Sequence, residues 1–115
     1  MRLTSSIILL TLSALASAAN LQPPVNRTAG AHTQVHWDVS PNDREESWTL
    51  FLMDPAYAFG LYAILGTEIQ NSLGVVDVVL PVGLDPSKDY ILKSVKNDWV
   101  DYVLQESPIF HITAA

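Results

Sequence analysis

The stretch VVDVVL, residues 75–80, decides the fold class of this protein. Four of its six residues are valine, whose branched side chain favours extended backbone. The turn residues Asn71-Ser72-Leu73-Gly74 precede the stretch and Pro81 ends it. A short β-branched run between turn residues is typical of a strand in a sheet.

Further strand-like segments lie on both sides of this stretch. Residues 33–38 alternate with period two and place Val35 and Trp37 on one face, whereas residues 48–53 are apolar on both faces, which predicts deeper burial. No segment has a convincing amphipathic helix pattern. The predicted strands are 33–38, 48–53, a short strand after a loop within 56–65 with 68–70 as a candidate extension, 75–80, 90–96 and 107–112. About seven short strands separated by turns predict an all-β fold, an antiparallel β-sandwich of immunoglobulin-like type.

The first 18 residues have the pattern of a secretory signal peptide. Met1-Arg2 is a short positive start, residues 7–12 are apolar, and Ala16-Ser17-Ala18 has the small-x-small pattern of a cleavage site. The alternative is a membrane anchor, but the apolar run is shorter than the roughly 20 residues that a spanning helix needs. We therefore expect cleavage of residues 1–18 and a secreted protein in which residues 19–115 form one β-sandwich domain.

Composition excludes several classes of function. The chain of 115 residues has 12 acidic and 6 basic side chains, a formal net charge of -6, and no cysteine. Nucleic acid is an unexpected partner for so acidic a chain, because binding to phosphates needs a dense positive field. Without cysteine, thiol catalysis and cysteine-based zinc sites are excluded, and no disulfide can support the secreted domain.

Asn26-Arg27-Thr28 is an acceptor sequence for N-glycosylation. It lies in a polar stretch between Pro24 and Gly30, where a modifying enzyme could reach it. We therefore predict that Asn26 carries a glycan.

The spacing of several apolar, Gly and Pro residues resembles a fungal family. The matching positions are Pro24, Ala29-Gly30, Val35-x-Trp37, Leu50-x-Leu52, Gly74, Leu80-Pro81, Gly83-Leu84, Tyr90 and Ser107-Pro108-x-Phe110-x-Ile112. This pattern is similar to the fungal cell-wall-synthesis N-terminal domain of killer-toxin-resistance and KNH-type proteins, which also occurs in Ser/Thr-rich GPI-anchored membrane proteins. The resemblance runs from about Asn20 to Ile112.

The resemblance implies an immunoglobulin/fibronectin-III-like sandwich, transport to the cell surface or cell wall, and a role in the assembly of wall β-glucan. It supplies no catalytic motif. The sequence departs from the family in having only Thr113-Ala114-Ala115 after Ile112, with no Ser/Thr-rich stalk and no GPI signal. A free secreted domain without a stable membrane anchor is therefore expected.

The aromatic residues divide into core and surface candidates. Trp37 and Trp48 lie on apolar sides of their strands and are expected in the core, and Tyr90 is expected to bond backbone at a structural corner. Trp99 differs, because it stands among loop-type polar residues at a predicted loop tip of residues 97–99.

The surroundings of Trp99 suit sugar recognition. The ring can stack on a pyranose, while Asn97, Asp98 and Asp101 bond hydroxyl groups and Tyr102 extends the surface. A second aromatic cluster, which is a candidate partner contact, comprises Tyr57, Phe59 and Tyr62. In the alternative interpretation, all these rings close the ends of the sandwich or form a dimer interface.

Metal binding and catalysis have little support in the sequence. His32 and His36 are four residues apart, which on a strand separates them by roughly 13 Å, too far to share a metal. Asp98 and Asp101 are the only close pair of carboxylates near aromatic residues, and no Gly-x-Ser-x-Gly motif occurs. We expect no catalytic residue, no cofactor and no metal.

Two functions remain as hypotheses. The first is a secreted, non-catalytic domain that binds wall polysaccharide, above all β-glucan, or assists its assembly. The second is a structural or protein-interaction domain that contacts a wall protein or forms a homodimer.

Overall fold

The computed structural model describes residues 20–39, 46–56 and 60–115. The predicted signal peptide of residues 1–18, and Tyr57 and Phe59 of the second aromatic cluster, lie outside these ranges. The described chain is almost entirely β structure, with one short 3-10 helix, η1 (Asn71–Leu73). Its strands are β1 (His32–His36), β2 (Ser47–Met53), β3 (Leu61–Gln70), β4 (Val75–Val79), β5 (Ile91–Lys96) and β6 (Trp99–Glu106).

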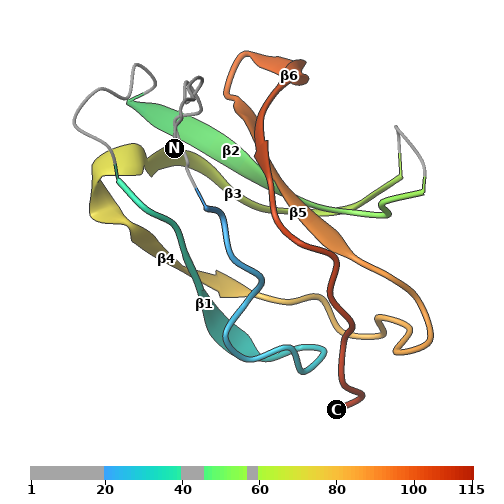
Figure 1. Ribbon diagram of the computed structural model, residues 1–115. Coiled ribbons are helices and arrows are strands. Elements are labelled where there is room, and N and C mark those ends of the chain that lie inside the picture. Colours follow the sequence, from blue (N-terminus) through green and yellow to red (C-terminus); the bar gives the residue numbers. More distant parts are fainter. Residues whose placement is uncertain (1–19, 40–45, 57–59) are drawn as a thin grey trace, which may run out of the picture.

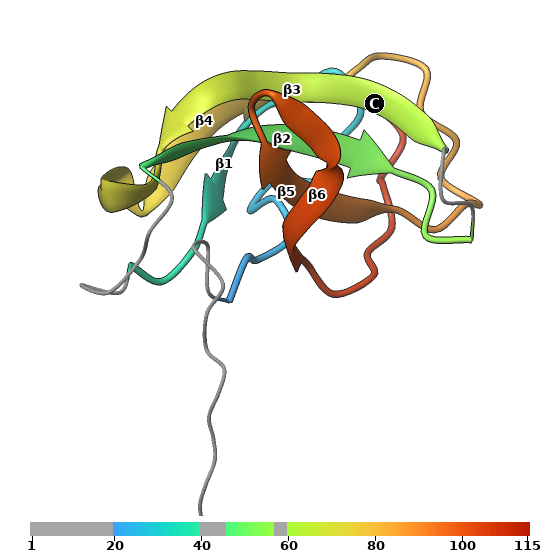
Figure 2. The same ribbon diagram turned by 90° about the horizontal axis from the view of Figure 1, so that it is seen from above.

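The strands form two antiparallel sheets (Figures 1 and 2). One sheet pairs β1 with β4, and the other has the order β3-β2-β5-β6. A core drawn from both sheets lies between them, with Val35 and Val78 from the first sheet and Leu50 and Leu92 from the second. The predicted all-β fold of two antiparallel sheets is thus confirmed.

The prediction of a last strand at 107–112 was wrong. The chain there makes only isolated bridges, Tyr90 with Phe110 and Thr28 with Thr113. Pro108 has no backbone N–H to donate to a sheet, which disfavours regular pairing in this segment. The described residues contain six strands rather than about seven.

The region of residues 61–70 forms one continuous strand, where we predicted a loop with a short strand. β3 is ten residues long, but its pairing with β2 shifts register three times. Glu68 adopts a φ of +50°, an uncommon backbone conformation for a residue other than glycine. Such bulges break the alternation of side chains, so the sequence of β3 has no clean period of two.

The inner core is organised around a pair of tryptophans, as predicted. The rings of Trp37 and Trp48 meet edge to face with centroids 4.8 Å apart. The indole N–H of Trp37 donates to the backbone carbonyl of Asn71 at 2.8 Å, and that of Trp48 donates to the Asn71 side-chain oxygen at 3.1 Å. Gly74 follows η1 with a φ of +72°, which glycine adopts without strain, and turns the chain into β4.

Tyr90 forms the predicted corner with the backbone. Its hydroxyl donates to the carbonyl of Asp85 and accepts the backbone N–H of Asp85, both at 2.9 Å. Burial raises the pKa of the Tyr90 hydroxyl above its usual value of 10.0. Within the same loop, hydrogen bonds from the Ser87 hydroxyl and then from its backbone N–H hold the pKa of Asp85 below 3.8.

In the part of the chain that the structure describes, no helix has the length and apolar character needed to span a membrane.

Candidate functional site

The hairpin formed by β5 and β6 projects at one end of the molecule (Figure 1). Asn97 and Asp98 form its two-residue turn, and Lys96 pairs with Trp99 at the base of the turn. Trp99 was predicted at a loop tip, but it begins strand β6, and Asp101 and Tyr102 also belong to this strand. The predicted sugar-binding residues therefore lie on a hairpin rather than on a free loop.

Two aromatic rings of the hairpin are exposed to solvent. Trp99 is 59% exposed and Tyr102 is 46% exposed, and their ring centroids are 5.4 Å apart at an interplanar angle of 57°. The Lys96 ammonium lies 4.8 Å from the centroid of the Tyr102 ring, a cation–π contact. Since the two rings are tilted, they do not form one flat platform.

Asn97 has a structural role that the sequence did not reveal. Its side-chain oxygen accepts hydrogen bonds from the Thr49 hydroxyl at 2.9 Å and from the backbone N–H of Glu68 at 3.1 Å. Its amide nitrogen donates to the Ser47 hydroxyl at 2.8 Å. Asn97 thus ties the hairpin turn to β2 and to the bulge of β3, and these bonds leave little of the amide for a ligand.

The two aspartates of the hairpin are separated by the geometry of β6. Asp98 lies exposed in the turn, whereas Asp101 lines a groove on the outer face of the larger sheet. Neither carboxylate makes an ion pair or a side-chain hydrogen bond within the described ranges 20–39, 46–56 and 60–115. Both remain free to accept hydrogen bonds from a ligand.

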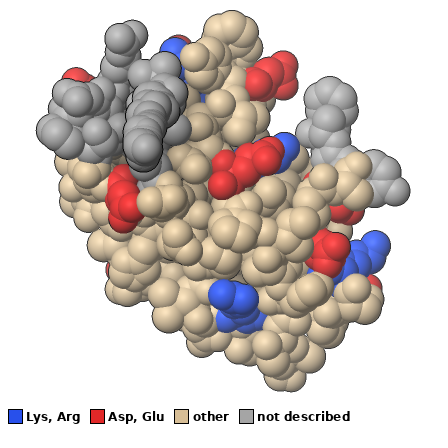
Figure 3. Space-filling model, in the orientation of Figure 1, with Lys and Arg blue, Asp and Glu red and all other residues tan. Residues whose placement is uncertain are grey.

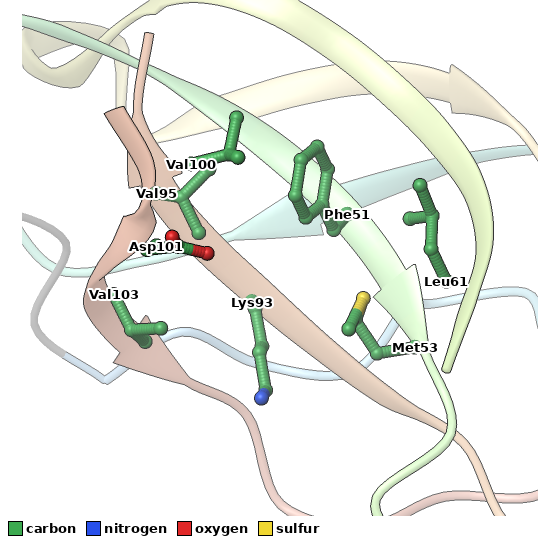
Figure 4. A pocket seen from close by; sticks show the side chains of 8 residues that line it. All are labelled: Phe51, Met53, Leu61, Lys93, Val95, Val100, Asp101 and Val103. Atoms are coloured by element: carbon green, nitrogen blue, oxygen red, sulfur yellow. The ribbon is translucent and has the colours of Figure 1, made fainter. Parts of the chain in front are cut away.

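The groove is the principal feature that the sequence did not predict. Its volume is about 460 Å³, which is within the size range of ligand pockets. β2 and β5 form its floor, and β3 and β6 stand on either side (Figure 4). The lining side chains are Phe51, Met53, Leu61, Lys93, Val95, Val100, Asp101 and Val103.

The floor of the groove is a second, smaller hydrophobic cluster. Phe51, Met53, Ile91 and Val95 are buried together on the face of the sheet that points away from the main core. The signal for this cluster was present in residues 48–53, which are apolar in both alternating registers. We took that pattern only as a sign of deep burial, and six of the seven residues of β2 are indeed buried.

The lysine in the groove is already paired. The Lys93 ammonium lies 3.3 Å from a carboxylate oxygen of Glu106, its register partner on β6. The lysine side chain is mostly buried, while the glutamate is half exposed.

The second aromatic cluster is only partly described. Tyr62 packs against Tyr90 with ring centroids 5.0 Å apart, and its hydroxyl lies 3.5 Å from a carboxylate oxygen of Asp54. The described member of the proposed partner contact therefore supports the corner formed by Tyr90 and keeps about 38% of its surface exposed.

Asn26 lies on the surface in a tight turn. Its side-chain oxygen accepts the backbone N–H of Thr28 at 3.0 Å, and its own backbone N–H donates to the Thr33 hydroxyl at 2.7 Å. The side chain is exposed, so the predicted glycan would extend into solvent.

The histidines are dispersed over the surface. His32 and His36 are exposed on β1, and His111 lies 2.7 Å from a carboxylate oxygen of Asp89. Among the residues whose placement is described, no group of three or more His, Asp or Glu side chains could hold a metal ion.

The face shown in Figure 3 is largely uncharged, with acidic and basic residues scattered over it. Comparison with known protein families and with curated proteins gave no match to this chain.

Proposed function

We propose that this protein is a secreted, non-catalytic domain of the fungal cell surface or cell wall that binds wall β-glucan through the β5–β6 hairpin. The observation that carries the proposal is the pair of exposed rings, Trp99 and Tyr102, on the hairpin whose turn holds the exposed Asp98. The two rings are adjacent, and contiguous exposed apolar surface is typical of interaction sites, whereas singly exposed apolar residues are not.

The fold supports a fibronectin-III-like or immunoglobulin-like assignment. The chain passes from β3 in the larger sheet to β4 in the smaller one, and back to β5 in the larger sheet. Such crossing between two sheets is a feature of Greek-key sandwiches, and a tyrosine that bonds upstream backbone is a hallmark of immunoglobulin-like folds. Tyr90 makes this contact with Asp85, five residues upstream. These features agree with the resemblance to the fungal cell-wall-synthesis domain.

The geometry of the rings limits how a sugar could bind. The angle of 57° between Trp99 and Tyr102 allows one pyranose to stack on the indole, but not two successive sugars on a shared plane. Asp98 and Asp101 supply carboxylate acceptors for hydroxyl groups. We expect weak binding, because a domain with a single stacking site gains no avidity from a repeating polymer.

The test is retention of the purified mature domain on insoluble β-1,3-glucan, β-1,6-glucan and chitin. Trp99→Ala should abolish retention on the glucan that binds. Ile109→Ala is the matched control, because Ile109 is 57% exposed and lies outside the hairpin. Equal retention of the wild type and of Trp99→Ala would refute the assignment of the hairpin, and absence of retention on every polymer would refute glycan binding.

The apolar groove favours a second candidate function, a domain that binds a wall protein or another copy of itself. Open apolar surface over the cluster of Phe51, Met53 and Val95 suits a protein side chain better than a sugar. Light scattering of the purified protein measures its oligomeric state and so distinguishes a homodimer from a domain that binds a wall protein. A strictly monomeric species at high protein concentration would exclude the homodimer.

A further inference from the structure

We infer that the groove between β3 and β6 binds an extended peptide segment of a partner protein, in which an apolar side chain stands next to a lysine or arginine. This inference rests on the second candidate function proposed above, the binding of a protein partner in the groove. It shares only Asp101 with the proposed sugar site and does not use the exposed ring pair.

The shape and lining of the groove favour an apolar side chain of the ligand. Phe51, Met53 and Val95 on its floor are less than 10% exposed, whereas Leu61 and Val103 on its sides are more than 40% exposed. The side chains in Figure 4 surround an open space above β2 and β5. An aromatic or large aliphatic side chain placed there would remove the exposed sides of the groove from water.

The charges in the groove favour a ligand that has a cationic group beside its apolar side chain. Of the two charged residues in the lining, Lys93 has Glu106 as its partner, and Asp101 has none in the described part of the chain. An approaching ammonium or guanidinium group would therefore meet a free carboxylate at the edge of an apolar surface. A peptide that covers this exposed carboxylate would partly desolvate it, which strengthens such a pair relative to one that stays fully exposed.

The backbone of β6 favours a peptide over a small amine as the ligand of the groove. Val95 pairs with Val103 and the adjacent Lys96 pairs with Trp99, so residues 100–102 have no register partner on β5. β6 is also the last strand of its sheet. The outer edge of β6 beside Val100 and Asp101 has no neighbouring strand in the described sheet, and bulges of this kind often lie next to binding sites.

The same charges disfavour a second copy of this protein as the occupant. A two-fold contact centred on Asp101 would bring the two Asp101 carboxylates together, while Lys93 is already paired and Lys96 lies against Tyr102. Like charges brought together at an interface oppose association. A basic partner removes this repulsion.

The experiment is a titration of the amide NMR spectrum with two short peptides. The probe is acetyl-Lys-Val-Phe-Val-Lys-amide, in which Phe and both lysines share one face of the extended chain. The comparison peptide replaces both lysines with glutamate. The basic peptide should shift the amides of Lys93, Val100, Asp101 and Val103, and the acidic peptide should not.

Three variants locate the binding. Asp101→Asn should weaken the basic peptide by about fivefold, in the range of a partly exposed ion pair. Val100→Lys should weaken it by more than about tenfold, because it places an ammonium group in the wall of the groove. Val79→Lys is the matched control on the other sheet, since Val79 is 50% exposed and Val100 is 51% exposed, and it should bind as the wild type does.

The inference is overturned by equal binding of the two peptides, by equal binding of Asp101→Asn and the wild type, or by unchanged amide shifts at millimolar peptide. A dimer that Val100→Lys dissociates in the absence of peptide would assign the groove to a second copy instead. Glucan retention is read separately with Trp99→Ala, so failure of the peptide leaves the glucan proposal standing, and the reverse holds.

Discussion

The two faces of the β3-β2-β5-β6 sheet are both apolar, yet they are built differently. On the inner face, Trp48, Leu50 and Leu92 are fully buried against the opposite sheet. On the outer face, Phe51 and Val95 belong to a small cluster of residues from β2 and β5, beneath an open groove. The inner face needs its apolar residues to fold, whereas the outer face carries more apolar residues than a solvated sheet face requires.

Strand β2 shows this difference most clearly. Its alternate residues face opposite sides of the sheet, and both sets are apolar apart from Ser47 and Thr49. A strand with one solvated face would alternate with polar residues, as β1 does. The outer set of β2 therefore has apolar residues, Phe51 and Met53, where a solvated face would have polar ones.

The largest expected effect belongs to the inner face. Trp48→Ala should lower the free energy of unfolding by about 3–5 kcal/mol, because it leaves a large cavity opposite Trp37. Phe51→Ala on the outer face should lower the free energy of unfolding by less than Trp48→Ala does, since the groove beside Phe51 is already open to solvent. Urea denaturation followed by circular dichroism measures both variants, and an equal cost would break the distinction between the faces.

The next effect concerns the polar group that orders the two tryptophans. Asn71→Ala removes the acceptor for the indole N–H of Trp48 and should cost about 1–3 kcal/mol, the range for a buried donor left unpaired. The same denaturation experiment applies. A cost below about 0.5 kcal/mol would mean that another acceptor replaces Asn71.

Loss of the Tyr90 corner should lower the free energy of unfolding by a smaller amount, and this amount should depend on pH. Tyr90→Phe removes both bonds to Asp85 and should cost about 1–2 kcal/mol. Because the folded pKa of Tyr90 is raised above the usual 10.0, its contribution is fully present below pH 10.0 and is lost as pH rises through the folded value. As pH rises above 10.0 and through the folded pKa of Tyr90, the free energy of unfolding should fall more for the wild type than for Tyr90→Phe. Parallel pH profiles of the two proteins would contradict this role of Tyr90.

The smallest effect on stability is expected on the outer face. Val100→Lys should change the free energy of unfolding by no more than about 0.5 kcal/mol, because half of Val100 is already exposed. If this variant instead unfolds the protein, the residues around the groove belong to the folding core and the distinction between the faces is wrong. Thermal unfolding beside Val79→Lys gives the comparison.

The inner face was largely predictable from the sequence, because burial there follows simple rules. Period-two alternation predicted the inward positions of Val35 and Trp37, and the predicted strand 75–80 agrees with β4 to within one residue. The corner at Tyr90 was predicted from its place at the start of a strand. Each of these features depends on neighbours in sequence or on a repeated pattern.

The outer face was not predictable in the same way, because bulges shape it. The register skip at residues 100–102 and the positive φ of Glu68 both break the alternation that identifies strands. As a result, the sequence predicts a loop tip at residues 97–99 and no strand over the rest of β6, and a loop with a short strand in place of β3. The groove itself arises from side chains of four strands, and no local pattern contains that arrangement.

The bonds of Asn97 have a consequence for the order of folding events. β5 and β6 are joined by a two-residue turn, so their pairing closes the shortest loop in the larger sheet and needs no distant part of the chain. The side chain of Asn97 can reach Ser47, Thr49 and the amide of Glu68 only after β2 and β3 have docked on that hairpin. These hydrogen bonds therefore form late, so Asn97→Ala should speed the unfolding rate while leaving the refolding rate nearly unchanged.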